Sequence, residues 1–188
     1  MGTIDTSQFR KKLKVILEGQ PWMIVENEFV KPGKGQAFNR TKFKNLLTGR
    51  VLEKSFRSGE TFEEADVSTT NMQYLYNDGH SYTFMDIKSY EQVEVQKEIM
   101  EDAAKWILEN AVCEVSFWGD RVISVTAPTF VDLLVKYTEP AVRGDTANNV
   151  TKKATLETGA EIDVPLFIEA GMKLKIDTRN GEYLQRST

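Results

Sequence analysis

The chain has very few of the residues from which catalytic and metal sites are most often built. Its 188 residues include one cysteine, Cys113, and one histidine, His80. A single cysteine excludes an internal disulfide and any multi-cysteine metal site, and a lone histidine with no identifiable serine or cysteine partner gives little support to a catalytic triad. We expect Cys113 to be a buried hydrophobe and His80 to lie at the solvent-exposed edge of a hairpin. The sequence therefore predicts no catalytic residue, no metal site and no bound cofactor.

Long apolar runs are also absent. No uninterrupted run reaches the roughly 18 residues that a transmembrane helix needs. The first residues lack the basic, apolar, small-residue order of a secretory signal. A single cysteine suits a reducing compartment. We expect a cytoplasmic protein that does not contact a membrane.

The formal net charge of −4 is unevenly distributed along the chain. Residues 1–64 hold 12 Lys and Arg against 8 Asp and Glu, a net charge of +4. Residues 65–128 hold 4 against 11, a net of −7, and residues 129–188 hold 8 against 9, a net of −1. These steps predict three domains with those boundaries, each of about 60 residues, which is within the range that folds independently.

Strand signals recur in all three segments, and Asn77-Asp78-Gly79 is a strong hairpin turn. The runs predicted as strands are residues 22–30 with 36–44, 72–76 with 82–85, 112–118 with 121–125, and then 130–137, 160–164, 172–176 and 183–185. We therefore expect an all-β protein of three small antiparallel barrels, of which the second and third are compatible with oligonucleotide-binding (OB) barrels. Compact domains of this length have a radius of gyration of ~11 Å, so three in a row would extend about 80 Å, the scale of a transfer RNA arm.

One segment breaks the strand pattern. Ile99, Ala103, Trp106 and Ile107 recur at helical spacing, and acidic residues precede Lys105, which suits the helix dipole. The spacing predicts a helix whose apolar stripe belongs to the core.

The first hairpin carries a stiff, glycine-rich turn, Lys31-Pro32-Gly33-Lys34-Gly35. Proline presets φ for the first corner of a turn and glycine accepts the positive φ of the second, so Pro32-Gly33 predicts a type II turn. Lys34 should then project outward, with glycine on both sides so that a partner can approach the backbone closely. The spacing required for a nucleotide-binding phosphate loop is absent.

The same hairpin is rich in positive charge. Residues 30–57 include eight basic residues and one acidic residue. Period-2 alternation places Arg40, Lys42 and Lys44 on one face of the second strand. A field of that sign attracts phosphate backbones, and the alternative is a solvated basic strand face that binds nothing.

Three groups of residues carry a family resemblance. Residues 29–38 (FVKPGKGQAF), followed by 46–49 (LLTG), closely resemble the first domain of bacterial elongation factor P. Residues 74–79 (YLYNDG) are similar to its middle domain. In the last third, the residues that fall at the spacing of the family's C-terminal signature are Lys152-Lys153-Ala154, Gly159, Ile162, Val164-Pro165, Ile168 and Gly171. The similarity covers essentially the whole chain, which is identified as a member of this family.

The resemblance implies a roughly L-shaped, monomeric translation factor, with an N-terminal KOW/SH3-like barrel followed by two OB barrels, and related to the hypusine-carrying factor of eukaryotes and archaea. Such a factor is not an enzyme. It enters the ribosome between the peptidyl and exit tRNA sites when synthesis stalls on consecutive prolines. Its partners are ribosomal RNA and ribosomal proteins, the peptidyl-tRNA in the P site, and messenger RNA.

The resemblance also implies that Lys34 is modified after translation. In bacteria with this loop, the addition is typically a β-lysyl group. A paralogue of lysyl-tRNA synthetase attaches it, a lysine aminomutase supplies it, and a hydroxylase can act afterwards. The lengthened side chain reaches toward the CCA end of the peptidyl-tRNA.

Other positions take roles from the same resemblance. The loop residues that would support the modified lysine are Lys31, Pro32, Gly33 and Gly35; those assigned to tRNA or ribosomal RNA are Arg40, Lys42, Lys44, Tyr183 and Arg186; and those near messenger RNA in the exit site are Gly144, Asp145 and Thr146. The last group can also be an ordinary Gly-Asp turn, and Tyr183 with Arg186 a stacked pair on the strand surface. The chain has Asn148-Asn149 where many relatives have small, glycine-containing residues.

Two other classes of function explain part of the pattern. A generic single-stranded RNA-binding OB protein would bind free oligonucleotides through stacking platforms and would not need Lys34. An enzyme that uses Lys34 as a Schiff-base nucleophile requires a desolvated lysine, whereas a lysine at the tip of a turn is expected to be exposed.

Overall fold

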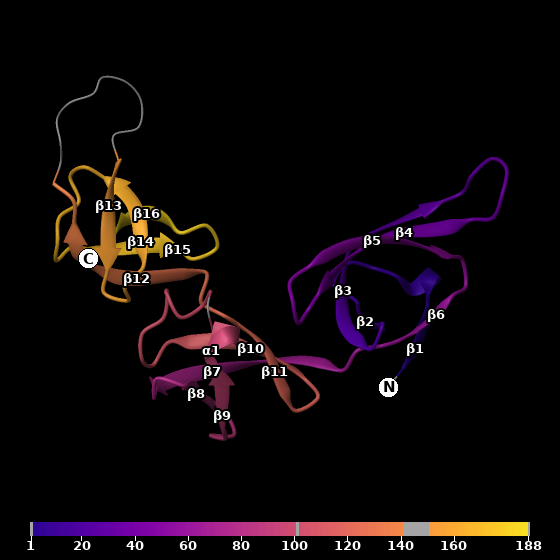
Figure 1. Cartoon of the computed structure of the whole chain (residues 1–188), viewed down its shortest axis with the longest axis horizontal. Coiled ribbons are helices and arrows are strands. Elements are labelled where there is room, and N and C mark those ends of the chain that lie inside the picture. The colour runs from indigo at the N-terminus through magenta and orange to yellow at the C-terminus, as the bar shows by residue number, and fades with distance from the viewer. Residues whose placement is uncertain (1, 101, 141–150, 188) are drawn as a thin grey trace. The chain divides into compact units, whose positions relative to one another are not determined.

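The computed structural model describes residues 2–100, 102–140 and 151–187, and almost all of its regular structure is β-strand (Figure 1). The expected all-β fold is confirmed. The chain divides into two compact units, Met1–Thr69 with Val115–Ser124 and Thr70–Glu114 with Val125–Thr188. These units do not coincide with the three segments inferred from charge, whose boundaries stay a prediction.

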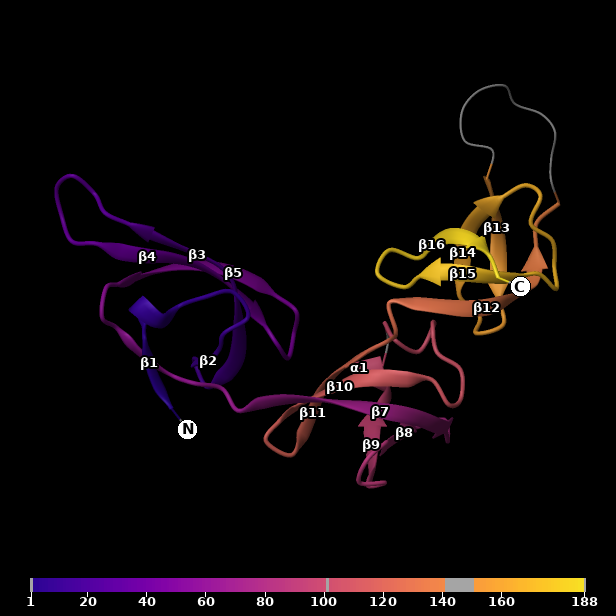
Figure 2. The same ribbon diagram turned by 180° about the vertical axis from the view of Figure 1, so that it is seen from behind.

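The N-terminal part contains a four-stranded antiparallel sheet in the order β2-β3-β4-β5 and a two-stranded ribbon. The sheet strands are β2 (Lys14–Leu17), β3 (Gln20–Val30), β4 (Phe38–Asn45) and β5 (Val51–Arg57); β1 (Thr3–Asp5) pairs with β6 (Thr61–Glu63), and a single 3-10 turn, η1 (Thr6–Gln8), follows β1. The predicted hairpin around Lys34 is confirmed as β3 and β4. Its ribbon extends beyond the other strands of the sheet (Figures 1 and 2).

Four phenylalanines form the centre of this core. Phe43 and Phe56, on neighbouring strands, meet edge to face with ring centroids 5.7 Å apart, and Phe9 and Phe62 complete the group at centroid distances of 4.9 to 6.3 Å. Edge-to-face contacts of this kind add to the stabilisation from burial alone. The alternation on β4 that points Phe43 inward points its neighbours to solvent, as the sequence predicted.

The middle sheet has the order β11-β10-β7-β8-β9. Its strands are β7 (Val67–Asn77), β8 (Ser81–Asp86), β9 (Gln92–Gln96), β10 (Val112–Trp118) and β11 (Arg121–Thr126), so both predicted hairpins are confirmed. His80 is exposed, as expected. Cys113 is 1 % exposed, and its burial raises the pKa of the thiol to about 11, which keeps it in the unreactive thiol form.

The C-terminal sheet has the order β14-β13-β12-β15-β16, and β14 also contacts β16, so the sheet curls toward closure. Its strands are β12 (Phe130–Thr138), β13 (Thr151–Leu156), β14 (Glu161–Pro165), β15 (Lys173–Asp177) and β16 (Glu182–Arg186). Four of these were predicted and β13 was not. Only Ala154 and Leu156 of β13 are fully buried, so its apolar alternation is too short to indicate a strand on its own.

The predicted helix is wrong in length. Helix α1 (Lys97–Met100) has only four residues, and the chain continues through tight turns in which the Trp106 amide donates to the Ala103 carbonyl at 3.0 Å. The apolar stripe is nevertheless core, as predicted: Ala103 is 2 % exposed, Trp106 7 % and Ile107 5 %. Helical spacing identified which residues are buried but not the backbone that buries them.

Trp106 explains why the segment departs from a helix. Its indole lies among the buried residues of the C-terminal barrel, including Leu133 and Ile176. The preceding residue is fixed by a 2.7 Å hydrogen bond from the Thr158 hydroxyl to the Lys105 carbonyl. On the barrel side, Gly181 has a φ of +73°, and a Cβ there would lie 3.3 Å from the indole ring. This tertiary contact outweighs the weak helical preference of one short segment.

We expect Trp106→Ala to lower the free energy of unfolding by about 3 to 5 kcal/mol, because it leaves a large cavity in the C-terminal core. Urea denaturation followed by circular dichroism measures this. Phe167→Ala is the control: it also deletes an aromatic ring from this part of the chain, but one that is 60 % exposed, so its effect should stay within about 0.5 kcal/mol. Equal effects for the two variants would show that the indole does not anchor the core.

Candidate functional site

The tip of the β3–β4 hairpin is exposed from Lys31 to Gln36. Residues 31–37 connect the two strands (Figure 1), and Lys34 is exposed together with both flanking glycines. No carboxylate in the part of the chain that the structure describes lies within ion-pair distance of Lys34. No atom lies within 4 Å of the position that a Cβ on Gly33 would take. The amine of Lys34 is therefore open to a partner from outside the chain.

The predicted turn type is wrong. A type II turn at Pro32-Gly33 requires positive φ at Gly33, but the positive φ of the loop, +116°, is at Gly35. A Cβ on Gly35 would lie 3.7 Å from the Pro32 ring, so the chain turns back beside the proline after Lys34 rather than before it. The backbone freedom of glycine is therefore needed at Gly35, where a side chain would be strained.

Below the tip, the two strands are locked by buried polar groups. Asn39 is 2 % exposed and Thr41 is fully buried, although both are polar. The Thr41 hydroxyl donates to Asn27 Oδ1 at 2.7 Å, and Asn27 Nδ2 donates to Asn39 Oδ1 at 3.3 Å and to the Phe9 carbonyl at 3.4 Å. No buried side-chain nitrogen or oxygen among the described residues lacks a partner. We call Asn27, Asn39 and Thr41 the hairpin triad.

The triad fits one strand register only. Asn27 lies opposite Thr41, after a bulge between Ile24 and Glu26 that increases the local twist of β3. A shift by one residue would turn the polar side chains to solvent and expose Phe43. The triad and the phenylalanines therefore hold the strands that carry Lys34 in a single alignment.

The turn at the opposite end of β4 is also fixed. Asn45 is 2 % exposed, and its Oδ1 accepts from the backbone amides of Leu47 at 2.8 Å and Thr48 at 2.9 Å. Its Nδ2 donates to Gln20 Oε1 at 2.6 Å. Gly49 ends the turn with a φ of +72°. These contacts give a structural role to residues 46–49, which form part of the sequence resemblance.

The outer face of the hairpin is not the uniformly basic surface that the sequence indicated. Lys42 Nζ lies 3.0 Å from a carboxylate oxygen of Glu26 and 3.9 Å from one of Glu53. Arg40 lies 3.7 Å from Glu28 and 4.0 Å from Glu53. The acids on β3 fall outside the segment whose charges were counted, and antiparallel pairing places them directly opposite the cations.

The Lys42–Glu26 ion pair shifts the pKa of both of its members. The hydrogen bond and charge of Lys42 lower the pKa of Glu26, and the same contacts raise the pKa of Lys42. Because the groups are exposed, screening by water and salt limits what they contribute to stability. Lys31, Lys34 and Lys44 form no ion pair with any residue in the described ranges, so the uncompensated positive charge of the hairpin lies at its tip and at Lys44 on β4.

The other residues predicted to contact RNA do not belong to the sheet that contains the β3–β4 hairpin. Tyr183 and Arg186 lie on β16 of the C-terminal sheet, where Tyr183 is partly buried against the core and Arg186 is exposed. Gly144, Asp145 and Thr146 lie outside the described residues. The roles of all five in RNA contact stay predictions.

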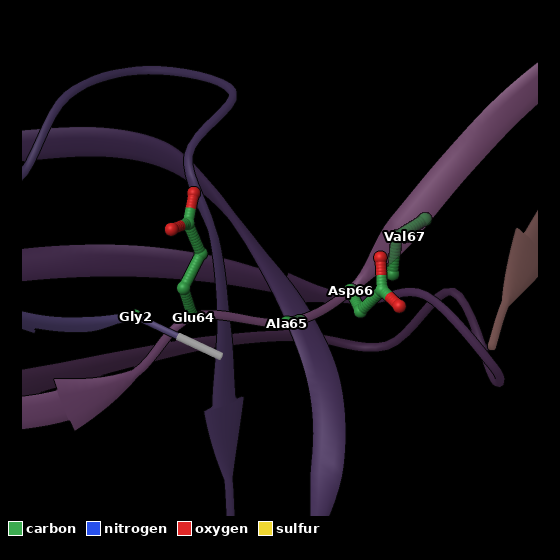
Figure 3. Close-up of a pocket in the computed structure, with 5 residues that line it drawn as sticks. All are labelled: Gly2, Glu64, Ala65, Asp66 and Val67. Atoms are coloured by element: carbon green, nitrogen blue, oxygen red, sulfur yellow. The ribbon is translucent and has the colours of Figure 1, made fainter.

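A hollow of about 440 Å³ lies at the segment that joins β6 to β7. It is lined by Gly2 and residues 64–67, with the carboxylates of Glu64 and Asp66 shown in Figure 3. Two carboxylates repel phosphate, and the hollow shares no residue with the hairpin tip. Within residues 2–100, 102–140 and 151–187, no group of three or more His, Cys, Asp and Glu side chains is placed to hold a metal ion. No helix in those ranges is long and apolar enough to cross a membrane.

Sequence reasoning missed the hairpin triad and the partners of Arg40 and Lys42. The inward positions of Asn39 and Thr41 can be read from alternation with Phe43, which was the available signal. The acidic partners require the β3–β4 register, which includes a bulge between Ile24 and Glu26.

Three family models match successive parts of the chain. The Elongation factor P (EF-P) KOW-like domain matches residues 5–62, the Elongation factor P (EF-P) OB domain matches residues 67–125, and the model Elongation factor P, C-terminal matches residues 131–186. The three matches follow one another in order and together span nearly the whole chain.

Two solved structures have a similar fold. Eukaryotic translation initiation factor 5A from Methanococcus jannaschii aligns with a TM-score of 0.52 and 19 % identity over 66 % of this chain and 95 % of that chain. A translation initiation factor eif-5a family protein from Naegleria fowleri aligns with a TM-score of 0.51 and 14 % identity over 66 % of this chain and 97 % of that chain. At such identities, the likeness concerns the fold alone.

Thr41→Val should lower the free energy of unfolding by about 1 to 3 kcal/mol, because it removes the donor to Asn27 while keeping the shape of the side chain. Chemical denaturation measures the change. Thr69→Val is the matched control, since the Thr69 hydroxyl lies 3.1 Å from that of Ser116 at an exposed site; its effect should be within about 0.5 kcal/mol. A Thr41 variant as stable as the control would contradict a locked register.

The Lys42–Glu26 pair predicts a pH dependence. Because the folded protein lowers the pKa of Glu26, the stabilisation from this pair is present above the ordinary carboxyl pKa and is lost as pH falls through the lowered value. In a titration of side-chain carboxyl carbons by NMR, Lys42→Gln should raise the pKa of Glu26 toward its ordinary value. An unchanged Glu26 titration would show that the two groups do not interact in solution.

Proposed function

Because the chain belongs to the elongation factor P family of translation factors, we propose that it binds the ribosome between the peptidyl and exit tRNA sites and relieves stalling on consecutive prolines. The coarse role, a translation factor, follows from the three matching family domains. The finer role rests on one observation: Lys34 is an exposed amine, with no carboxylate of the described chain beside it, at the tip of a hairpin whose base is locked.

Lys34 is proposed to carry a β-lysyl group attached by a paralogue of lysyl-tRNA synthetase. An amide bond forms between Lys34 Nζ and the activated carboxyl of β-lysine; the activating group leaves, and the amine gives up a proton. The open surroundings of Gly33 and the exposure of Lys34 support this proposal, since an enzyme must bring its own active site to the amine. A lysine aminomutase and a hydroxylase are the other enzymes that the proposal requires.

The extended side chain is proposed to act by positioning. The ring of proline fixes φ and its secondary amine is hindered, so it reacts slowly in peptide transfer. Holding the CCA end of the peptidyl-tRNA in a reactive geometry removes an entropic barrier, for which orientation can supply up to ~7 to 11 kcal/mol. The terminal ammonium adds charge and hydrogen-bond donors beside sugar and phosphate oxygens. The bond-forming chemistry belongs to the ribosome, so the chain itself is not an enzyme.

A positioning role requires a stiff support, and the hairpin base provides one. The hairpin triad fixes the register of β3 and β4, while the edge-to-face packing of Phe43 and Phe56 fixes the sheet beneath them. The ion pairs of Arg40 and Lys42 brace the outer face and leave fewer free cations for RNA than their number implies.

The remaining parts of the proposal are those carried over from the family. They place a monomeric, elongated, L-shaped molecule in the cytoplasm, with Tyr183 and Arg186 against tRNA and residues 144–146 near messenger RNA in the exit site. A generic single-stranded RNA-binding protein is the alternative. It differs in one testable respect, because it has no need of Lys34.

Lys34→Ala should abolish relief of polyproline stalling in a reconstituted translation assay while leaving the thermal midpoint unchanged, because an exposed side chain at a loop tip contributes little to stability. Lys34→Arg should fail equally, because arginine keeps the charge but lacks the amine that forms the amide bond. Intact-mass measurement of the protein from its native host should show the added group on the wild type and on neither variant.

Lys88→Arg is the control, since Lys88 is an exposed lysine on a different turn and should remain fully active. A fully active, unmodified Lys34→Arg variant would remove the case for modification. Full activity of Lys34→Ala would favour the alternative function.

A further inference from the structure

Several basic side chains lie on the outer face of the C-terminal sheet, where β12 pairs with β15. Both strands are labelled in Figure 2. Leu133 faces Leu174 on the buried side, so the residues between them in the alternation point outward. The outward row of β12 begins with Phe130, and the outward row of β15 contains Lys173 and Lys175. We call Phe130, Lys173, Lys175 and Arg179 the β12–β15 patch.

An exposed aromatic ring organises the patch. Phe130 is 49 % exposed. Lys175 Nζ lies 5.7 Å from the centroid of its ring and Arg179 Cζ lies 6.0 Å from it. Cation–π attraction at these distances restrains two long, flexible side chains that would otherwise sample many rotamers. The ring therefore holds two positive groups close together at the surface.

The guanidinium of Arg179 is further oriented by Asp177. Nε donates to Oδ1 at 2.9 Å and Nη2 donates to Oδ2 at 2.6 Å, a two-point contact. Asp177 is only 5 % exposed, whereas the side chain of Arg179 is 70 % exposed. The contact lowers the pKa of Asp177, which stays ionised. Asp177 thus accepts hydrogen bonds from Nε and Nη2, on one edge of the guanidinium. The remaining N–H donors of Arg179 are available to a ligand.

The backbone under the patch is also held in place. The Thr178 amide donates to the Thr129 carbonyl at 2.9 Å, and its hydroxyl donates to the Pro128 carbonyl at 2.8 Å. The strand that carries Phe130 and the turn that carries Arg179 are therefore joined by direct hydrogen bonds, so the geometry of the patch does not depend on side-chain contacts alone.

The lysines of the patch are not neutralised by the described chain. Asp132 lies opposite Lys175 in the strand register, yet neither Lys173 nor Lys175 has a carboxylate of the described residues within 4.0 Å. This differs from the outer face of the N-terminal hairpin, where Arg40 and Lys42 are both paired. Two lysines without an ion pair, beside an exposed ring and a guanidinium that keeps free N–H donors, match the charge of a phosphodiester backbone.

We propose that the β12–β15 patch binds the phosphodiester backbone of RNA, a contact separate from Lys34 and from the inward-facing Tyr183. Lys175 and Arg179 contact phosphate oxygens, Arg179 through its free N–H donors, and Lys173 contributes a further charge along the same strand. The proposal rests on the proposed function in one respect: the RNA is met on the ribosome, as ribosomal RNA or as bound tRNA.

Salt dependence of ribosome binding tests the contact. Each phosphate contact that is removed reduces the slope of log K against log salt by about 0.7 to 0.9. Lys175→Gln should therefore bind bacterial 70S ribosomes that carry tRNA in the P site about five- to eightfold more weakly at 0.1 M salt, with a slope smaller by that amount. Lys173→Gln should act in the same direction. Thermal midpoints equal to that of the wild type would show that both variants fold.

Lys153→Gln is the matched control. It removes one charge from the same sheet, but Lys153 Nζ already lies 2.8 Å from Asp163. Its slope should stay that of the wild type. Equal slopes for Lys175→Gln, Lys153→Gln and the wild type would overturn the proposal, and so would equal losses in both variants, since those would reflect net charge rather than a site.

Crosslinking identifies the partner. With benzoylphenylalanine in place of Phe130, irradiation of the 70S complex should give crosslinks to RNA, and sequencing of the crosslinked fragment separates ribosomal RNA from tRNA. Crosslinks to ribosomal protein alone would overturn the proposal. Lys34→Ala, tested for ribosome binding and in the polyproline translation assay, keeps the two proposals apart: loss of activity with normal binding supports the role of Lys34, whatever the patch variants do.

Discussion

The alignment of β3 with β4 is the constraint on which the candidate site depends. Strand pairing alone tolerates a slip, but a slip by one residue would expose Phe43 and leave the amide and hydroxyl groups of Asn27, Asn39 and Thr41 without their partners. Satisfied buried polar groups define the register together with the apolar face, because a slip breaks their mutual hydrogen bonds and exposes Phe43 at the same time. The location of Lys34 at the tip follows from that register.

Much of this architecture was predictable from the sequence, because its signals are local. Turn residues and period-2 alternation identified the hairpins around Lys34 and Asn77, and alternation on β4 correctly separated inward from outward side chains. The failures share a cause, which is dependence on distant partners. The predicted helix is shortened because Trp106 packs into the core of the C-terminal sheet. The turn type depends on the close approach of Gly35 to the Pro32 ring.

Charge illustrates the same limit. Counting basic residues along residues 30–57 indicated a cationic face, but two acids on the neighbouring strand compensate Arg40 and Lys42. The β12–β15 patch was not evident from the sequence, since residues 129–188 are nearly neutral overall. Cross-strand geometry, rather than composition, decides which cations remain available to an anionic partner.

The close fit between Trp106 and Gly181 has a consequence for how related chains can diverge. Any side chain larger than hydrogen at position 181 would meet the indole, and a smaller residue at position 106 would leave a hole that glycine cannot fill. A substitution at either position is therefore tolerated only when the other position is substituted as well. A hybrid that joins the C-terminal barrel of one homologue to the preceding part of another should fold well only when both members of this pair come from compatible parents.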